Sequence, residues 1–198
     1  MTLAGKSLST LLEEFRSAAP TPGGGSAAAL AGALGASLLA MVASLPKPRA
    51  TIDADLQRLG NAGARCTDLA RRLEALIDRD AEAYDRVVSA YRLPKGSDAE
   101  KAARSAAIQA ALKDAIEVPL DVMRACATAI DNAAVIAALG NANASSDVGV
   151  GVELLRAGRR GAQLNVEINL ESVKDPEYVS AVRRGFSVNE SGAAGDPT

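Results

Sequence analysis

The stretch from Thr51 to Arg92 reads TIDADLQRLGNAGARCTDLARRLEALIDRDAEAYDRVVSAYR and predicts one long helix. Its mostly apolar or small residues recur at alternating steps of four and three, which is the spacing of a buried helical seam. The seam consists of Ile52, Leu56, Leu59, Gly63, Cys66, Ala70, Leu73, Ile77, Asp80, Tyr84, Val87 and Tyr91. Asp80 alone is charged. Because a buried carboxylate needs a partner or a cavity, Asp80 is the first candidate for function.

The uncharged stretch Ser26–Leu45 predicts a second helix, built mainly from Ala, Gly, Ser and Leu. Small residues recur every fourth position and make a flat strip, formed by Ala28, Gly32, Ala36 and Ala40. Such a strip allows close approach of another helix, in a core or at a subunit interface. The stretch is long enough to span a bilayer, but it lacks aromatic or basic anchors at its N-terminal edge. We therefore expect a core helix of a soluble protein.

The other helices are indicated by their end signals. A short helix is expected over Ser7–Ala18, with Ser7 as N-cap. Ser97 and Glu100 form a capping-box pattern that starts another helix. Pro119 predicts a kink or a restart in that region, and Gly140 predicts the end of the segment that follows.

A turn-rich loop, Asn141–Asp147, precedes the next predicted helix. Ser145 or Ser146 is expected to cap this helix, with Asp147 in its positive first turn. Its predicted inner face consists of Leu154, Gly158, Gly161, Asn165 and Ile168.

Length and pattern together predict a single all-α domain over residues 1–184, a compact bundle of about six helices around one long central helix. Asp175 and Pro176 open the last short helix, because an acidic cap followed by proline is typical of a helix start. Residues 185–198 are expected to be a disordered tail.

Composition restricts the chemistry. The chain has 198 residues, a net charge of −2 and no histidine, which excludes His-based triads and the usual zinc sites. Cys66 and Cys126 lie in apolar patterns and are expected to be small buried thiols, so no metal site is expected. The sequence pI of about 5.3 disfavours nucleic-acid binding. No secretory signal is evident, and a cytoplasmic location is expected.

Five segments resemble, in the same order, the formiminotransferase-cyclodeaminase/methenyltetrahydrofolate cyclohydrolase family. They are PTPGGGSAAAL (20–30), RLPKGSDAEKAAR (92–104), VPL (118–120), GNANASSDVGV (140–150) and LNVEINL (164–170). Two regions depart from the family. Leu45–Leu56 differs in sequence, and the chain ends in GFSVNESGAAGDPT where relatives usually carry a further helical stretch.

The resemblance implies a homodimeric folate enzyme that hydrolyses methenyltetrahydrofolate to formyltetrahydrofolate. Two alternatives stay open: a formiminotetrahydrofolate cyclodeaminase that releases ammonia, and a non-catalytic folate-binding or helical interaction module. Either reaction requires a carboxylate near the amidinium cation of the substrate, a group that transfers protons, and donors for the pterin. No cofactor beyond the tetrahydrofolate substrate, no nucleic acid and no membrane partner are expected.

Three residues are candidates for catalysis. The aspartate of the family falls on Asp80, whose alternative role is a solvated charge or one neutralised by Arg79 or Arg86. Lys95, in the RLPK segment, is a candidate for proton transfer or carboxylate binding, and equally a solvated loop lysine. Asp147 is a candidate contact to the pterin or the cation, besides being a first-turn acid.

The candidates for substrate binding come from three segments. Gly23, Gly24, Gly25 and Ser26 precede a helix N-terminus, where backbone N–H groups attract anions or carbonyl-type acceptors. Their alternative role is a hinge with positive φ. Asn141 and Ser146 are otherwise turn and cap residues. Asn165 lies one helical turn from Asn169, and its alternative role is a hydrogen-bond bridge between helices.

Overall fold

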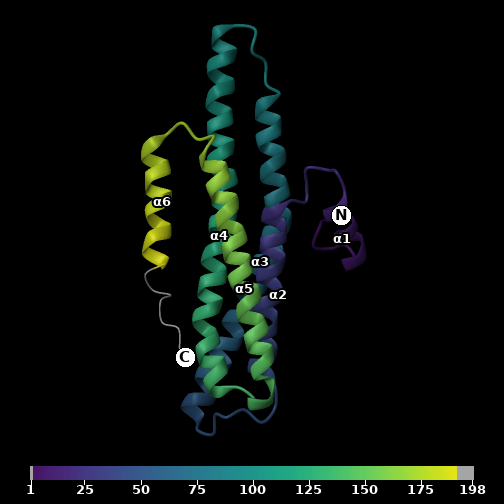
Figure 1. The fold of residues 1–198 in the computed structure, drawn as a ribbon, viewed down its shortest axis with the longest axis vertical. Coiled ribbons are helices and arrows are strands. Elements are labelled where there is room, and N and C mark those ends of the chain that lie inside the picture. Colours follow the sequence, from purple (N-terminus) through teal and green to yellow (C-terminus); the bar gives the residue numbers. More distant parts are fainter. Residues whose placement is uncertain (1, 191–198) are drawn as a thin grey trace.

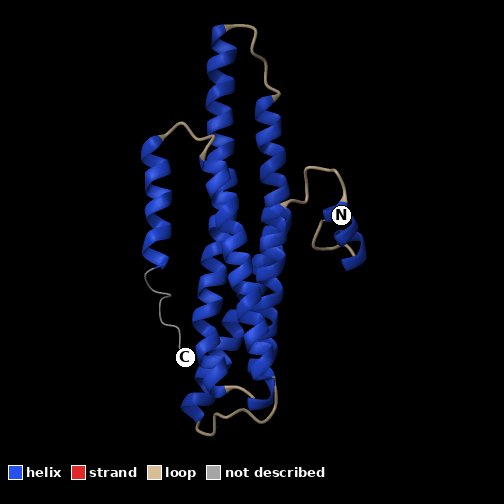
Figure 2. Ribbon diagram, viewed as in Figure 1, coloured by secondary structure: helices blue, strands red, loops and turns tan. Residues whose placement is uncertain are grey.

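The computed structural model describes residues 2–190, and within that range the chain forms helices and loops without strands (Figures 1 and 2). The six α-helices and one short 3₁₀ helix are α1 (Leu8–Arg16), α2 (Gly24–Ser44), α3 (Asp53–Tyr91), α4 (Asp98–Leu139), η1 (Ala142–Ala144), α5 (Ser145–Leu170) and α6 (Pro176–Glu190). The predicted all-α fold is confirmed.

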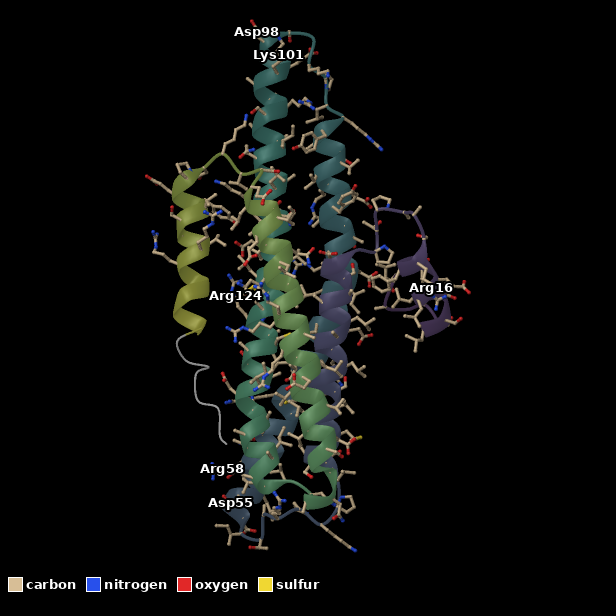
Figure 3. The ribbon with its side chains drawn as sticks, viewed as in Figure 1. Arg16, Asp55, Arg58, Asp98, Lys101 and Arg124 are labelled. Atoms are coloured by element: carbon tan, nitrogen blue, oxygen red, sulfur yellow. The ribbon has the colours of Figure 1, made fainter. Side chains whose placement is uncertain are left out.

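Four helices form the bundle. α2 packs against α3 and α5, and α4 packs against the same two neighbours, so α2 and α4 lie on opposite corners. α3 and α4 extend past the ends of α2 and α5 as a two-helix projection (Figure 1). α1 and α6 lie outside the bundle on opposite sides. Ion pairs mark the two tips: Lys101 with Asp98 at 2.8 Å, and Arg58 with Asp55 at 3.1 Å (Figure 3).

Glycines set the distance between α2 and α5. A Cβ on Gly158 would lie 2.8 Å from the Ala28 carbonyl oxygen, and one on Gly35 would lie 2.6 Å from the Gly151 carbonyl oxygen. The two backbones are therefore in direct contact, as the small-residue strip predicts for a helix interface inside the core.

α4 runs without a break through Pro119, so the predicted restart is wrong. At 42 residues α4 is longer than α3, with 39, and the bundle has two long helices in place of one central helix. Proline inside a helix costs about 3 kcal/mol, because it removes one hydrogen bond and its ring clashes with the carbonyl four residues earlier. Close packing compensates for this loss, since Ile116, Val118 and Val122 are at most 1% exposed.

The start and the inner face of α5 also differ from the prediction. Neither Ser145 nor Ser146 caps the helix, which begins at Ser145 after an N-cap at Ala144 without a side-chain bond. The buried residues are Val148, Gly151, Leu155, Gly158, Ala162, Val166 and Leu170. Ile168, predicted to face inward, is 59% exposed. Gly158 and Gly161 of the predicted stripe lie against Ala28 of α2, whereas the rest of the stripe lies beside the buried face of α5.

Other end signals act as expected. Ser7 accepts from the Thr10 N–H, and Ser97 and Glu100 form the reciprocal capping box. The predicted tail boundary at residue 184 is wrong, because α6 continues to Glu190. Gly185 keeps a helical backbone in place of the left-handed one that ends many helices. Residues 191–198 lie outside the described range.

Two helices, α2 and α4, are long and apolar enough to cross a membrane on length and composition alone. In the structure both are bundle helices, and α2 is joined to α5 through the glycine contacts above. Close helix packing of this kind accounts for a composition without charges in α2.

Candidate active site

The centre of the candidate site is Asp80, which α3 holds against the first turn of α2. The Ser26 N–H donates to Asp80 Oδ2 at 2.8 Å. Ser26 Oγ lies 2.9 Å from the same oxygen and 3.0 Å from the Ile77 carbonyl oxygen, so its proton has two acceptors. The N-cap of α2, Gly23, has no side chain to cap the helix. Asp80 therefore caps α2 from another helix.

The glycines beside Ser26 allow this contact. A Cβ on Gly25 would lie 2.0 Å from Asp80 Oδ1, and one on Gly24 would lie 3.2 Å from Asn165 Nδ2. No glycine in the described range has a positive φ, so the hinge interpretation of this segment is wrong. The run of glycines allows α3 and α5 to approach the N-terminus of α2 closely.

A pocket of about 230 Å³ opens at this point. It is lined by Pro20, Thr21, Gly23, Gly24, Gly25, Asp80, Ala83, Tyr84, Val87, Ala115, Asn165 and Asn169. Asn165 Nδ2 donates to the Gly161 carbonyl at 2.8 Å within its own helix, so the predicted bridge between helices is wrong. Five of the predicted site residues line this pocket and Ser26 supports it: Asp80, the three glycines and Asn165.

Burial raises the pKa of the Asp80 carboxyl, and the two bonds from Ser26 only partly oppose this effect. Neutralisation by Arg79 or Arg86 is not observed between residues 2 and 190: Arg79 pairs with Asp121 at 3.9 Å. A carboxyl with a raised pKa at the wall of a pocket is suited to proton transfer.

Four predicted site residues lie elsewhere in the chain. Lys95 is exposed in the α3–α4 loop, beyond the end of α3, and α3 itself ends roughly 16 Å along its axis from Asp80. Ser146 and Asp147 are in the first turn of α5, with Asp147 roughly 27 Å along that helix from Asn165. Within one chain, none of these three reaches the pocket.

Asn141, the fourth, has a structural role. Its Nδ2 donates to the Pro46 carbonyl at 2.6 Å, and its Oδ1 accepts from the Asn143 N–H at 2.9 Å. The side chain thus ties the loop before α5 to the segment after α2, at the end of the bundle away from Asp80. Substrate binding in this chain's own pocket is excluded for Asn141.

The sequence interpretation did not select three residues of the pocket wall, Tyr84, Val87 and Ala115. Tyr84 and Val87 are the next two positions after Asp80 on the α3 seam, which is a signal that would have identified them. In a regular helix the N–H of residue 119 would donate to the Ala115 carbonyl oxygen, but Pro119 has no N–H. The proline in the sequence was therefore a signal for the position of Ala115.

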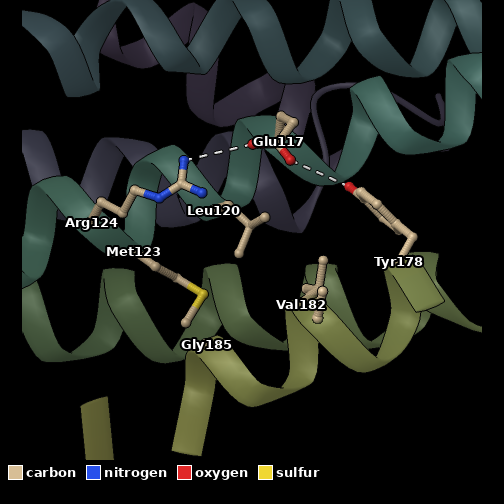
Figure 4. A pocket seen from close by; sticks show the side chains of 8 residues that line it. Glu117, Leu120, Met123, Arg124, Tyr178, Val182 and Gly185 are labelled. Atoms are coloured by element: carbon tan, nitrogen blue, oxygen red, sulfur yellow. Dashed lines mark hydrogen bonds and ion pairs between the residues drawn. The ribbon is translucent and has the colours of Figure 1, made fainter. Parts of the chain in front are cut away.

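A larger pocket of about 300 Å³ lies between α4 and α6 (Figure 4). Glu117 pairs there with Arg124 at 3.6 Å and lies 3.3 Å from the Tyr178 hydroxyl. Burial and the nearby Glu117 raise the pKa of Tyr178 to about 12, so its hydroxyl stays protonated. None of the predicted site residues lines this pocket, and its polar groups bond one another.

Within the described range, no group of three or more His, Cys, Asp or Glu side chains is close enough to hold a metal ion. Burial raises the pKa of Cys66 to about 11 and that of Cys126 to about 12. Both side chains are free and buried, as predicted, and they are protonated at neutral pH.

With this geometry in hand, comparison with known proteins identifies the family. Residues 7–187 match the family model of formiminotransferase-cyclodeaminase. The chain belongs to this family. The predicted family is thereby confirmed.

The methenyltetrahydrofolate cyclohydrolase of Methylorubrum extorquens is 45% identical over 176 residues, which cover 87% of this chain and 83% of that protein. The formimidoyltransferase-cyclodeaminase of Sus scrofa is 34% identical over 94% of this chain, which spans 34% of that longer protein. A crystal structure of formiminotetrahydrofolate cyclodeaminase from Thermotoga maritima has a TM-score of 0.78 at 27% identity, over 94% of this chain and 89% of that one.

Proposed function

We propose that this protein hydrolyses methenyltetrahydrofolate to formyltetrahydrofolate. The observation that carries the proposal is Asp80, a carboxyl of raised pKa held by Ser26 at the wall of a pocket with two amides, Asn165 and Asn169. Similarity at 45% identity to a cyclohydrolase, along most of both chains, supports the choice of reaction.

The substrate is an amidinium cation in which one carbon bridges two folate nitrogens. Ionised Asp80 attracts this cation and takes a proton from the attacking water, whose oxygen bonds to the bridging carbon. One of the two carbon–nitrogen bonds then breaks. The departing nitrogen receives the hydroxyl proton of the adduct, the formyl group remains on the other nitrogen, and Asp80 releases its proton to water.

The carboxylate position is well defined for this role, because two donors of Ser26 fix one oxygen, Oδ2. The other oxygen, Oδ1, approaches the α carbon of Gly25, where any side chain would collide with it. The amides of Asn165 and Asn169 supply donors and acceptors suited to the pterin edge.

The alternative reaction is ring closure of formiminotetrahydrofolate with release of ammonia. Similarity to cyclodeaminases of Sus scrofa and Thermotoga maritima favours it as the second candidate. A third possibility is a folate-binding module without catalysis.

The test is the loss of methenyltetrahydrofolate absorbance on adding protein, paired with an ammonia assay on the formimino substrate. A cyclohydrolase consumes the methenyl compound and releases no ammonia from the formimino compound. Ammonia release identifies the cyclodeaminase, and absence of both signals with retained folate binding identifies the non-catalytic module.

The remaining properties of the proposal rest on the resemblance to the family and on the sequence. We infer a cytoplasmic homodimer that uses no cofactor beyond the tetrahydrofolate substrate and binds neither nucleic acid nor membrane. The net charge of −2 supports the absence of nucleic-acid binding, and the absence of histidine supports the absence of a zinc cofactor.

A further inference from the structure

Tyr84 is the one aromatic residue among those that line the candidate active site. It follows Asp80 by four residues on α3, and residues at this spacing are neighbours on one face of a helix, with Cβ atoms about 5–6 Å apart. Both residues line the pocket, and Tyr84 is 41% exposed. The aromatic ring and the carboxylate are therefore open to the same bound molecule.

The pocket wall carries charge of one sign. Among the described residues that line it, Asp80 alone is charged, and neither Lys nor Arg is present. The other polar side chains are the hydroxyls of Thr21 and Tyr84 and the amides of Asn165 and Asn169. A wall that combines a carboxylate with an aromatic ring and has no basic group suits a cation better than an anion.

The other two tyrosines show how this chain uses an aromatic face. The guanidinium carbon of Arg104 lies 5.6 Å from the centre of the Tyr91 ring, and Lys113 Nζ lies 4.9 Å from that of Tyr178. Both distances are within the roughly 6 Å of a cation–π contact. Within residues 2–190, Tyr84 has no such cation over its ring, and its hydroxyl makes no hydrogen bond. The ring at the pocket is thus the tyrosine ring left for a bound cation.

The proposed substrate carries the matching charge. The methenyl bridge of methenyltetrahydrofolate is an amidinium cation, whereas the formyl group of the product is neutral. An aromatic face attracts a cation through its quadrupole and has no comparable attraction for a neutral group. The ring can therefore distinguish substrate from product by charge. The amides of Asn165 and Asn169 cannot do so through the pterin, which both folates share.

We propose that the Tyr84 ring binds the cationic methenyl bridge and gives this site a preference for methenyltetrahydrofolate over formyltetrahydrofolate. The contact forms before water attacks and weakens as the bridge loses its charge. Tyr84 therefore favours substrate binding and product release more than it accelerates the chemical step. The inference rests on the proposed function, but it requires only that the cation binds. In the alternative reaction, ring closure, the same cation is the product.

Binding is measured with Asp80→Asn protein, so that the substrate is not consumed. The preference is the ratio of the dissociation constants for formyltetrahydrofolate and methenyltetrahydrofolate. Adding Tyr84→Leu is expected to lower this ratio about 2–30-fold, the range of a cation–π contact, since apolar contacts are lost equally for both ligands. Tyr84→Phe is expected to keep the ratio, because the hydroxyl has no partner. An unchanged ratio in Tyr84→Leu would show that the ring is only an apolar wall, and would overturn the proposal.

Fluorinated phenylalanines at position 84 separate charge from shape. Each fluorine withdraws electron density from the ring face with little change in ring size. Binding of methenyltetrahydrofolate is expected to weaken stepwise from Tyr84→Phe to the 3,4,5-trifluoro ring, while binding of formyltetrahydrofolate stays constant. Tyr91→Leu is the matched control, because Tyr91 lies two turns further along α3 and outside the pocket wall. It is expected to leave both constants unchanged. A flat fluorine series contradicts the proposal even if Tyr84→Leu proves unstable.

Kinetics with Asp80 intact separate this inference from the proposed function. Tyr84→Leu is expected to raise KM for methenyltetrahydrofolate about 2–30-fold with little change in kcat. A loss confined to kcat would assign Tyr84 to the chemical step and refute the proposal. If wild type binds the methenyl compound without hydrolysing it, and Tyr84→Leu removes the preference, the proposed function fails and the inference stands. If wild type hydrolyses the compound but Tyr84→Leu keeps the preference, the inference fails and the proposed function stands. A wild-type protein that binds neither folate refutes both.

Discussion

Asp80 has two roles at the scale of single residues, because the same carboxylate caps α2 and faces the pocket. The Asp80→Asn variant separates them. An amide oxygen still accepts from the Ser26 N–H, so the thermal midpoint is expected to stay within a few degrees of wild type. Turnover is expected to fall about 10²–10⁴-fold, the usual contribution of a general base. Both are measured on one preparation, and unchanged turnover with a large loss of midpoint would assign Asp80 to the scaffold alone.

The pKa of Asp80 predicts a pH dependence of turnover. Burial raises this pKa, and the base must be ionised, so turnover is expected to fall as pH drops through the raised value. The contribution of Asp80 to stability changes with pH in the opposite direction. The fold favours the protonated carboxyl, so the contribution of Asp80 to stability is full at low pH and is lost as pH rises through its folded pKa. A pH–rate profile whose acidic limb persists in Asp80→Asn would contradict the assignment.

Gly25 and Gly60 make a matched pair of glycine substitutions. In Gly25→Ala the new Cβ meets the Asp80 carboxylate, and we expect a loss of about 1–3 kcal/mol of stability together with reduced turnover. A Cβ on Gly60, inside α3, meets nothing within 4 Å. Gly60→Ala is expected to stabilise the protein by about 0.5–1 kcal/mol with turnover unchanged. Urea unfolding curves measure both changes, and equal effects would refute the close-contact interpretation.

Element-scale packing depends on the contact between α2 and α5. Gly158→Ala places a methyl group 2.8 Å from the Ala28 carbonyl oxygen and is expected to push the helices apart, at a cost of about 1–3 kcal/mol. Gly149→Ala, on the same helix, meets nothing within 4 Å and is expected to be neutral or stabilising. The thermal midpoints of the two variants should move in different directions; a Gly158→Ala protein as stable as wild type would contradict the structure.

Over the whole molecule, the chemistry is expected to require no metal ion. The chain has no histidine, and its two cysteines are buried and protonated, which leaves no imidazole or thiolate ligand for a transition metal. Dialysis against a strong chelator is expected to leave turnover unchanged. Restoration of lost activity by zinc after such dialysis would show that this expectation is wrong.

The sequence alone determined the family, the all-helical class and the special status of Asp80. The family follows from the resemblance of the five segments. The helical class and the status of Asp80 follow from local rules, since helix periodicity, capping patterns such as Ser97 with Glu100, and a charge on an apolar seam are all visible along the chain. The continuation of α4 through Pro119 was not predictable in this way, because packing by neighbouring helices offsets the local cost of proline.

The tertiary structure decided which candidate residues share a site. Gly24, Gly25, Asp80 and Asn165 meet because helices with different positions in the chain cross at one point. Along the chain, Asp147 is nearer to Asn165 than Asp80 is. In the structure, however, Asp147 lies at the other end of α5. Distance along a rigid helix grows by about 1.5 Å per residue, whereas side-by-side packing brings residues 54 positions apart into hydrogen-bond contact, as Ser26 and Asp80 show. That contact depends on the three-dimensional packing of the bundle, which no local pattern encodes.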